Sequence, residues 1–180
     1  MTKYKTEQMA EEKTENMAED IVDILNSKIL SGKSLERMLA FWRFKSLRIV
    51  FTNGCFDILH RGHVEYLARA SRLGDVLLVG LNTDRSVKTI KGPPRPLLDE
   101  KSRSLLLASL SFVSGVIQFD LETPLELITK IRPDILVKGS DYRPEEIVGA
   151  DIVTAGGGKV ITIDLVKGYS TSDIIRKLRS

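Results

Sequence analysis

The chain reads IVFTNGCFDILHRGH over residues 49–63, and this stretch decides the fold. Its first three residues are apolar without polar alternation, which is typical of a strand buried on both faces. Gly54 then allows a tight turn or the close approach of a ligand to the backbone. A helical pattern follows from His63 to Leu73. The stretch therefore predicts a buried strand, a short loop and a helix whose N-terminus can attract an anion.

Beyond this stretch, short apolar runs alternate with helical patterns. Strands are expected at residues 76–79, 116–119, 135–137 and 160–163. Helices are expected from the N-cap Asp99 to Leu110, from the N-cap Thr123 and the first helical residue Pro124 to Ile131, and over residues 173–178 after the N-cap Ser172. Buried strands interleaved with helices predict a doubly wound, Rossmann-like α/β fold with a parallel sheet. Ligands of such folds bind beyond the carboxyl ends of the strands.

Residues 1–45 differ from the main domain expected at 46–180, and they predict a helical N-terminal extension. One apolar stripe comprises Ile21, Ile24, Leu25 and Ile29, and a second comprises Leu35, Met38, Leu39 and Trp42. Gly32 is expected to end the first helix, and Ser34 to cap the second. Both stripes need a covering surface. They fit either a hairpin packed on the main domain or an arm that forms a dimer.

The composition of the chain narrows the class of protein. Its 180 residues are 42% hydrophobic and 28% charged, which suits a folded domain and excludes a disordered tail or a disulfide-rich miniprotein. The apolar runs are too short for a transmembrane helix, and the polar N-terminus has no signal-peptide core. The single cysteine, Cys55, fits a reducing cytoplasm. A net charge of +3 favours an anionic small molecule over nucleic acid as the partner.

The two histidines of the chain, His60 and His63, both lie in the quoted stretch. Gly62 between them leaves room for a phosphate, and imidazole N–H groups can donate hydrogen bonds to phosphate oxygens. The pattern therefore favours phosphate handling. A zinc site completed by Cys55 or Asp57, and histidines with a purely structural role, are the weaker alternatives. The sequence lacks a Walker phosphate loop, and no Gly-x-Gly-x-x-Gly follows the strand.

The quoted stretch resembles the signature of the cytidylyltransferase-like nucleotidyltransferases, whose core is His-x-Gly-His. Further segments occur in the same order in one branch of that family, the adenylyltransferases that make ADP-heptose for lipopolysaccharide. These segments are residues 79–84, 91–92 with 95–96, 131–142 and 168–175. The resemblance covers residues 46–180 and implies the HxGH nucleotidyltransferase fold. Because the sequence contains no sugar-kinase domain, the resemblance also implies the stand-alone form.

The resemblance implies an enzyme that transfers AMP from ATP to a sugar 1-phosphate, with heptose 1-phosphate as the acceptor and pyrophosphate as the second product. The implied catalytic residues are His60, His63 and Lys91. The implied nucleotide-binding residues are Thr52, Asn53, Gly54, Cys55, Phe56, Asp57, Gly62, Gly139, Asp141, Ser170, Thr171 and Ser172. The implied acceptor-binding residues are Asn82, Asp84 and Lys138. Mg²⁺ is expected with ATP, without an assigned protein ligand. The implied protein is a cytoplasmic homodimer that binds neither nucleic acid nor membrane.

Two other functions stay open at this point. One is a cytidylyltransferase for another small phosphorylated acceptor, and the other is a nucleotide-binding module without turnover. Cytidylyltransferase relatives carry Arg-Thr-Glu-Gly before the last helix, where this chain has Val166-Lys167-Gly168-Tyr169. The absence of that arginine weakens the cytidylyl alternative.

Several residues of this region are interpreted without a catalytic role. Lys88 and Arg103 are expected to be surface charges, although Arg103 could reach a pyrophosphate if its helix faces the site. Lys88 and Lys91 are expected on a loop after the second strand. Asp57 is expected to orient the turn or a histidine, and Cys55 to fill space. The run Gly156-Gly157-Gly158 is expected to form a turn between strands.

Overall fold

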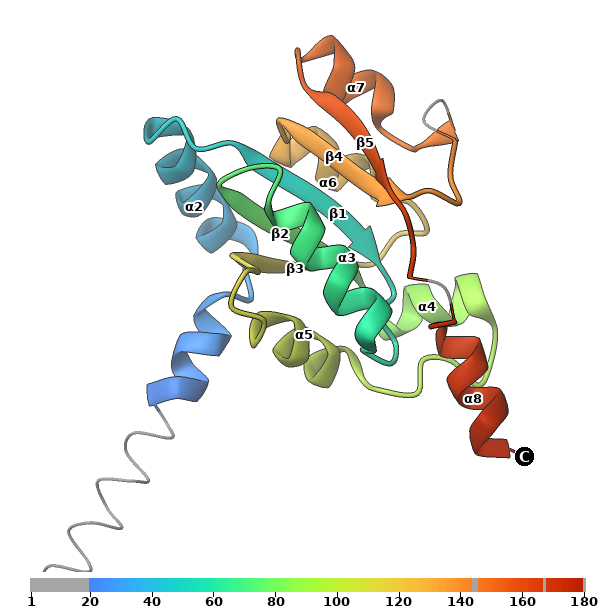
Figure 1. Cartoon of the computed structure of the whole chain (residues 1–180). Coiled ribbons are helices and arrows are strands. Elements are labelled where there is room, and N and C mark those ends of the chain that lie inside the picture. Colours follow the sequence, from blue (N-terminus) through green and yellow to red (C-terminus); the bar gives the residue numbers. More distant parts are fainter. Residues whose placement is uncertain (1–19, 144–145, 167, 180) are drawn as a thin grey trace, which may run out of the picture.

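The computed structural model describes residues 20–143, 146–166 and 168–179, and its centre is a five-stranded parallel sheet of order β3-β2-β1-β4-β5 (Figure 1). The strands are β1 (Ile49–Gly54), β2 (Val76–Asn82), β3 (Gly115–Phe119), β4 (Ile135–Gly139) and β5 (Lys159–Ile163). Each of them matches an expected strand. The doubly wound, Rossmann-like α/β fold is therefore confirmed.

The described helices include two that the sequence pattern did not reveal, α4 and α7. The helices are α2 (Gly32–Phe44), α3 (Arg61–Ser71), α4 (Asp84–Lys91), α5 (Glu100–Ala108), α6 (Leu125–Ile131), α7 (Ala150–Ala155) and α8 (Thr171–Arg179). Lys88 and Lys91 thus belong to a helix, and their expected loop was wrong. The glycine run from Gly156 ends α7 and leads into β5, so it joins a helix to a strand. Within the described part of the chain, none of the helices is long and apolar enough to cross a membrane.

Apolar side chains from the two faces of the sheet form two core clusters. On one face, Phe51 and Leu136 pack with residues of α2, α6 and α7. On the other face, Val50 and Val137 pack with residues of α3 and α5. Because both faces are covered, the strands carry continuous apolar runs, and all seven residues of β2 are buried.

The segment before β1 is built into this core. Leu30 N donates to Val116 O at 2.8 Å, and Val116 N donates to Lys28 O at 2.9 Å, so residues 28–30 extend the sheet beyond β3. Leu39 and Trp42 are buried in the same cluster as β1. The domain boundary at residue 45 stays a prediction, although side chains before and after it share one core.

The expected helix ends before β1 were wrong in detail. The described part of the first helix covers residues 20–27, so this helix ends before Gly32. Gly32 instead begins α2, where its φ of 45° suits a residue without a side chain. Ser31 is the N-cap of α2, and Ser34 completes a capping box by accepting from the Ser31 backbone N–H at 2.9 Å. The packing of α2 on the core supports the hairpin alternative for this part of the extension.

The carboxyl ends of β1 and β4 point toward α4 and α8 (Figure 1). The chain runs outward from β1 through β2 to β3 and then returns to β4 on the other side of β1. The pair β1 and β4 is therefore the topological switch point, where α/β folds bind their ligands.

Candidate active site

A cavity of about 590 Å³ lies beyond the carboxyl ends of the strands. It is lined by all the predicted site residues except Thr52 and Asp84. The loop after β1 contributes one wall, and the segments after β2, β3, β4 and β5 contribute the others. Residues that are far apart in sequence thus meet where the fold predicted the chemistry. Their roles stay predictions, which the geometry below makes specific.

The imidazole rings of His60 and His63 lie side by side in the wall of this cavity. His60 is the N-cap of α3, and His63 lies in its first turn. The ring centroids are 3.9 Å apart with an angle of 17° between the planes. Burial lowers the pKa of His60, and burial together with the neighbouring His60 lowers the pKa of His63 to about 4. Neutral imidazoles each keep one N–H, so the pair can donate hydrogen bonds to an anion without itself being charged.

Gly62 lets the C-terminal segment approach the start of α3. A Cβ atom at this position would lie 3.1 Å from the His60 ring and 3.1 Å from the Tyr169 Cβ. Arg61 also donates to the Tyr169 hydroxyl at 3.2 Å. A side chain at Gly62 would therefore press first on His60 and Tyr169, and only through them on a phosphate.

Asp57 anchors the loop that follows α4. Its Oδ1 accepts hydrogen bonds from Leu97 N at 2.6 Å and from Leu98 N at 3.2 Å, and its carboxylate pairs with Arg95. Asp57 is 2% exposed, and this set of partners occupies it. The carboxylate therefore orients a turn, as expected, and it fixes the Arg95 guanidinium at the cavity wall.

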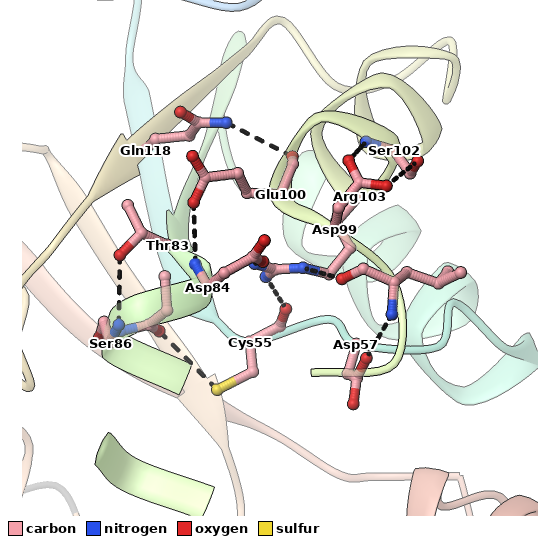
Figure 2. Close-up of polar contacts among 12 residues, drawn as sticks. Cys55, Asp57, Thr83, Asp84, Ser86, Asp99, Glu100, Ser102, Arg103 and Gln118 are labelled. Atoms are coloured by element: carbon pink, nitrogen blue, oxygen red, sulfur yellow. Dashed lines mark hydrogen bonds and ion pairs between the residues drawn. The ribbon is translucent and has the colours of Figure 1, made fainter. Parts of the chain in front are cut away.

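Arg103 is buried, so its expected surface position was wrong. Its side chain donates to Asp84 Oδ1 at 2.7 Å, to Cys55 O at 2.6 Å and to Leu98 O at 3.0 Å (Figure 2). Only 1% of Arg103 is exposed. Asp84 does not line the cavity, and its carboxylate is held by this cation. The guanidinium joins the loop after β1 to α4 and to the segment before α5.

Lys91 ends α4 and lines the cavity, whereas the exposed Lys88 does not. Cys55 also lines the cavity, and its Sγ lies 4.0 Å from Asn82 Oδ1. Burial raises the pKa of the Cys55 thiol, although Lys91 and Arg103 oppose this effect. A protonated thiol is a poor nucleophile, which agrees with a space-filling role.

Two neighbouring strands bring Lys138 and Asn53 together. Lys138 Nζ donates to Asn53 Oδ1 at 2.5 Å and lies 5.4 Å from the centre of the Tyr142 ring. Burial lowers the pKa of Lys138 to about 8, against the opposing charge of Asp141. Gly139 gives that carboxylate room, since a Cβ there would lie 2.4 Å from Asp141 Oδ1.

The side chains of Thr52 and Asn82 form hydrogen bonds with other groups of the protein. The Thr52 hydroxyl shares a hydrogen bond of 2.8 Å with the Tyr66 hydroxyl, and Thr52 is fully buried. Asn82 Nδ2 donates to Ser86 Oγ at 2.8 Å and to Leu121 O at 3.2 Å. Both residues therefore support the cavity wall, and Asn82 also lines it.

The helix α8 begins at the same cavity as α3. Ser170 Oγ accepts a hydrogen bond from Asp173 N at 3.0 Å, so Ser170 is the cap, and the expected cap Ser172 was wrong. Residues 170–172 all line the cavity. Similarly, Pro124 is the N-cap of α6, one residue later than the predicted Thr123. Two helix N-termini thus give the cavity a positive field.

The zinc alternative finds no support in the residues that the structure describes, because no three of their histidine, cysteine, aspartate and glutamate side chains gather as a metal site. Asp57, the proposed third ligand, is already paired with Arg95 and two backbone N–H groups. The side chains at this place therefore do not fit a resident metal ion.

Several cavity residues escaped the sequence reasoning as site residues. Arg95 and Tyr169 lie within the segments that carried the family resemblance, which was the signal that could have identified them. Tyr66 occupies an apolar helix position that resembles ordinary core. Glu122 lies in the segment after β3 and had no local signal.

Comparison with known proteins agrees with the fold. The sequence model of the family described as cytidylyltransferase-like matches residues 51–177. A relative named bifunctional protein HldE, from Syntrophotalea carbinolica, is 52% identical over 168 residues, which are 93% of this chain and 34% of the relative. The protein of the same name from Methylobacillus flagellatus is 54% identical over 153 residues, which are 85% of this chain and 31% of the relative. The chain thus spans about a third of the length of these curated relatives.

A solved structure shows the same arrangement. It is the lipopolysaccharide core biosynthesis protein from Thermoplasma volcanium GSS1, with a TM-score of 0.54 and 30% sequence identity. The likeness covers 69% of this chain and 99% of that protein.

Proposed function

The chain belongs to the cytidylyltransferase-like family of nucleotidyltransferases, and we propose that it transfers AMP from ATP to a sugar 1-phosphate, with heptose 1-phosphate as the acceptor. The observation that carries this proposal is the stacked pair His60 and His63 at the N-terminus of α3. The N-terminus of α8 lines the same cavity. The adenylyl and heptose assignments rest on the resemblance of residues 131–142 and 168–175 to the ADP-heptose branch. The similarity to a lipopolysaccharide core biosynthesis protein supports them.

In the proposed reaction, an oxygen of the sugar phosphate attacks the α-phosphorus of ATP. A new P–O bond forms, and the bond from the α-phosphorus to the oxygen that bridges to the β-phosphate breaks. The products are an ADP-sugar and pyrophosphate. Because the attacking phosphate is already ionised, no strong general base is needed. Catalysis then depends on alignment and on donors to the negative charge that develops around the α-phosphate.

His60 and His63 would supply those donors, and Lys91 would stabilise the leaving pyrophosphate. The β1–β4 switch point suits the nucleotide. The nucleotide would be bound by the loop after β1, by Gly139 with Asp141, and by the start of α8. The side formed by the segments after β2 and β3 is then available for the acceptor. Lys138 lies beside Asn53, which is one of the predicted nucleotide-binding residues. The assignment of Lys138 to acceptor binding stays a prediction.

Mg²⁺ would enter as part of the substrate, in its complex with the triphosphate of ATP, where water fills much of the coordination shell. This proposal agrees with the donor set, since Asp57 is occupied by Arg95 and backbone N–H groups. A cytoplasmic homodimer remains part of the proposal. Sedimentation of the purified chain over a concentration series tests the dimer.

Pyrophosphate release tests the activity. Four nucleoside triphosphates are each combined with several sugar 1-phosphates in the presence of Mg²⁺. We expect release with ATP and heptose 1-phosphate. Release with CTP and not with ATP would replace this proposal by the cytidylyltransferase alternative. No release with any pair would favour a binding module without turnover.

The variant His63→Ala serves as the matched negative control. Loss of one donor to a developing anion lowers turnover by roughly 10²- to 10³-fold. Its far-ultraviolet circular dichroism and thermal melting should stay close to those of the parent chain. Turnover near the parent value in a folded His63→Ala variant would refute the role of this imidazole as a phosphate donor.

A further inference from the structure

The segment after β3 forms one wall of the cavity, beside the end of β2. Asn82 is the last residue of β2 and pairs with Phe119, the last residue of β3. Glu122 follows three residues later and lines the cavity, together with Lys91 and Arg95. This wall lies on the opposite side of β1 from Lys138 on β4. It is therefore the wall farther from the proposed nucleotide position.

The backbone that carries Glu122 is held in place by residues of β2 and α4. Leu121 O accepts hydrogen bonds from Asn82 Nδ2 at 3.2 Å and from Ser86 Oγ at 2.8 Å. The preceding residue, Asp120, accepts from the Thr83 hydroxyl and pairs with Arg85. The polar groups that could have bound substrate here thus fix the position of the segment instead.

The Glu122 side chain differs from the other acidic groups on this side of the molecule. Asp57 pairs with Arg95, and Asp84 pairs with Arg103. Among the described residues, no hydrogen bond or ion pair involves the Glu122 carboxylate, and Glu122 is an exposed residue of the cavity lining. A fixed backbone therefore presents an uncommitted carboxylate to the acceptor side.

A carboxylate at this wall repels the phosphates of both substrates. A favourable contact with another part of a substrate would offset this repulsion. A carboxylate can only accept hydrogen bonds, and its two oxygens can take two hydroxyl donors at once. Sugars present such pairs of neighbouring hydroxyl groups. Arg95 on the same wall disfavours a cationic acceptor and suits the phosphate of a sugar 1-phosphate.

We infer that Glu122 determines acceptor specificity by accepting hydrogen bonds from ring or side-chain hydroxyl groups of the sugar 1-phosphate. This inference rests on the proposed function. It assigns recognition of the sugar hydroxyl groups to Glu122 and binding of the sugar phosphate to Arg95. The acceptor class is a polyhydroxylated sugar phosphate, in contrast to a phosphorylated amine or a short alcohol.

The test compares Glu122→Ala and Glu122→Gln with Glu146→Gln, which changes another exposed cavity-lining glutamate that follows β4. Steady-state pyrophosphate release gives KM for ATP and for the sugar 1-phosphate. We expect Glu122→Ala to raise KM for the sugar 1-phosphate by about tenfold or more, because a charged hydrogen-bond acceptor is lost. KM for ATP should change less than about twofold, and Glu122→Gln should be intermediate. Glu146→Gln should leave KM for the sugar phosphate near the parent value.

Acceptors that lack one hydroxyl group at a time separate contact from a general disturbance. With the analogue that lacks the hydroxyl bound by Glu122, the parent chain and Glu122→Ala should have the same KM. Equal KM values for the intact sugar phosphate in both chains would overturn the inference. The inference would also be overturned if Glu122→Ala raised KM by the same factor with every analogue. Turnover by the parent chain is measured in the same assay, so absence of turnover counts against the proposed function and not against Glu122 alone.

Discussion

The rings of His60 and His63 stack at 3.9 Å, and this contact works against protonation of both rings at once. Two imidazolium cations at that distance would repel each other, and a backbone contact of His63 with Ile58 only partly opposes the lowered pKa of His63. Burial is the larger cause of the lowered pKa values, and the neighbouring ring adds to it for His63. The folded protein therefore holds the pair neutral.

Stability should fall on acidification because of this pair. The pKa of His63 is about 4 in the folded chain and 6.5 in an unfolded one, so the unfolded chain binds more protons between these values. The contribution of the neutral ring is full above pH 6.5 and is lost as the pH falls toward 4. About 2 kcal/mol of stability is lost between pH 7 and pH 5. Urea unfolding at pH 7 and pH 5 measures it.

The variant His63→Gln is the control for this titration. Glutamine keeps a polar side chain and removes the titrating ring, so it should lose less stability than the parent chain between pH 7 and pH 5. Equal losses in the two proteins would assign the acid sensitivity to other groups, and the neutral pair would lose its support.

Lys138 should make substrate affinity depend on pH in the alkaline range. Its pKa of about 8 means that the free protein loses this positive charge as the pH rises from 7 to 9. The charged form binds phosphate better, so KM for the substrate that Lys138 contacts should rise by roughly tenfold across this range. Lys138→Met should have a raised KM at pH 7 and a flat profile. Lys88→Met, at an exposed position outside the cavity, should follow the parent profile.

The profile also identifies the substrate that Lys138 contacts. A rise confined to KM for ATP would give Lys138 to the nucleotide, and a rise confined to KM for the sugar phosphate would bear out the acceptor assignment. A parent profile as flat as that of Lys138→Met would contradict both.

Arg103 should be worth far more to stability than a surface arginine. Its side chain is fully buried against Asp84, and removal of one partner of a buried pair costs about 3 to 5 kcal/mol. Arg85 offers the matched comparison, since it pairs with Asp120 from a side chain that is 82% exposed. Loss of an exposed pair costs at most about 1 kcal/mol. Urea unfolding of Arg103→Met and Arg85→Met compares them, and similar values would rule out a structural role of Arg103.

The sequence was sufficient for the parts of the fold that depend on local pattern. The five strands follow from uninterrupted apolar runs, because both faces of a parallel sheet are buried. The helix α4 was missed because only two of its eight residues, Val87 and Ile90, are apolar, and of these two only Val87 is buried. The six residues of α7 are too few for a clear period.

The site divides in the same way. His60, His63 and the loop before them lie within one short segment, so their nearness follows from the sequence itself. The burial of Arg103 depends on which face of α5 meets the loop after β1, and that is a property of the packed fold. Glu122 and Arg95 likewise reach the cavity only because segments after different strands converge. The resemblance gave the residue types, and the packing decided which side chains remain free for substrate.

The two faces of α2 give the last prediction, which concerns residues 20–45. Leu39 is 4% exposed in the core that β1 also enters, whereas Phe44 is 82% exposed. Leu39→Ala should destabilise the chain by about 2 to 5 kcal/mol, because it leaves a cavity in that core. Phe44→Ala should change the free energy of unfolding of the monomer by less than about 0.5 kcal/mol. Urea unfolding at low protein concentration measures both. If α2 were instead an arm that leaves the domain intact, Leu39→Ala would cost no more than Phe44→Ala, and residues before 45 would not be part of the folding unit.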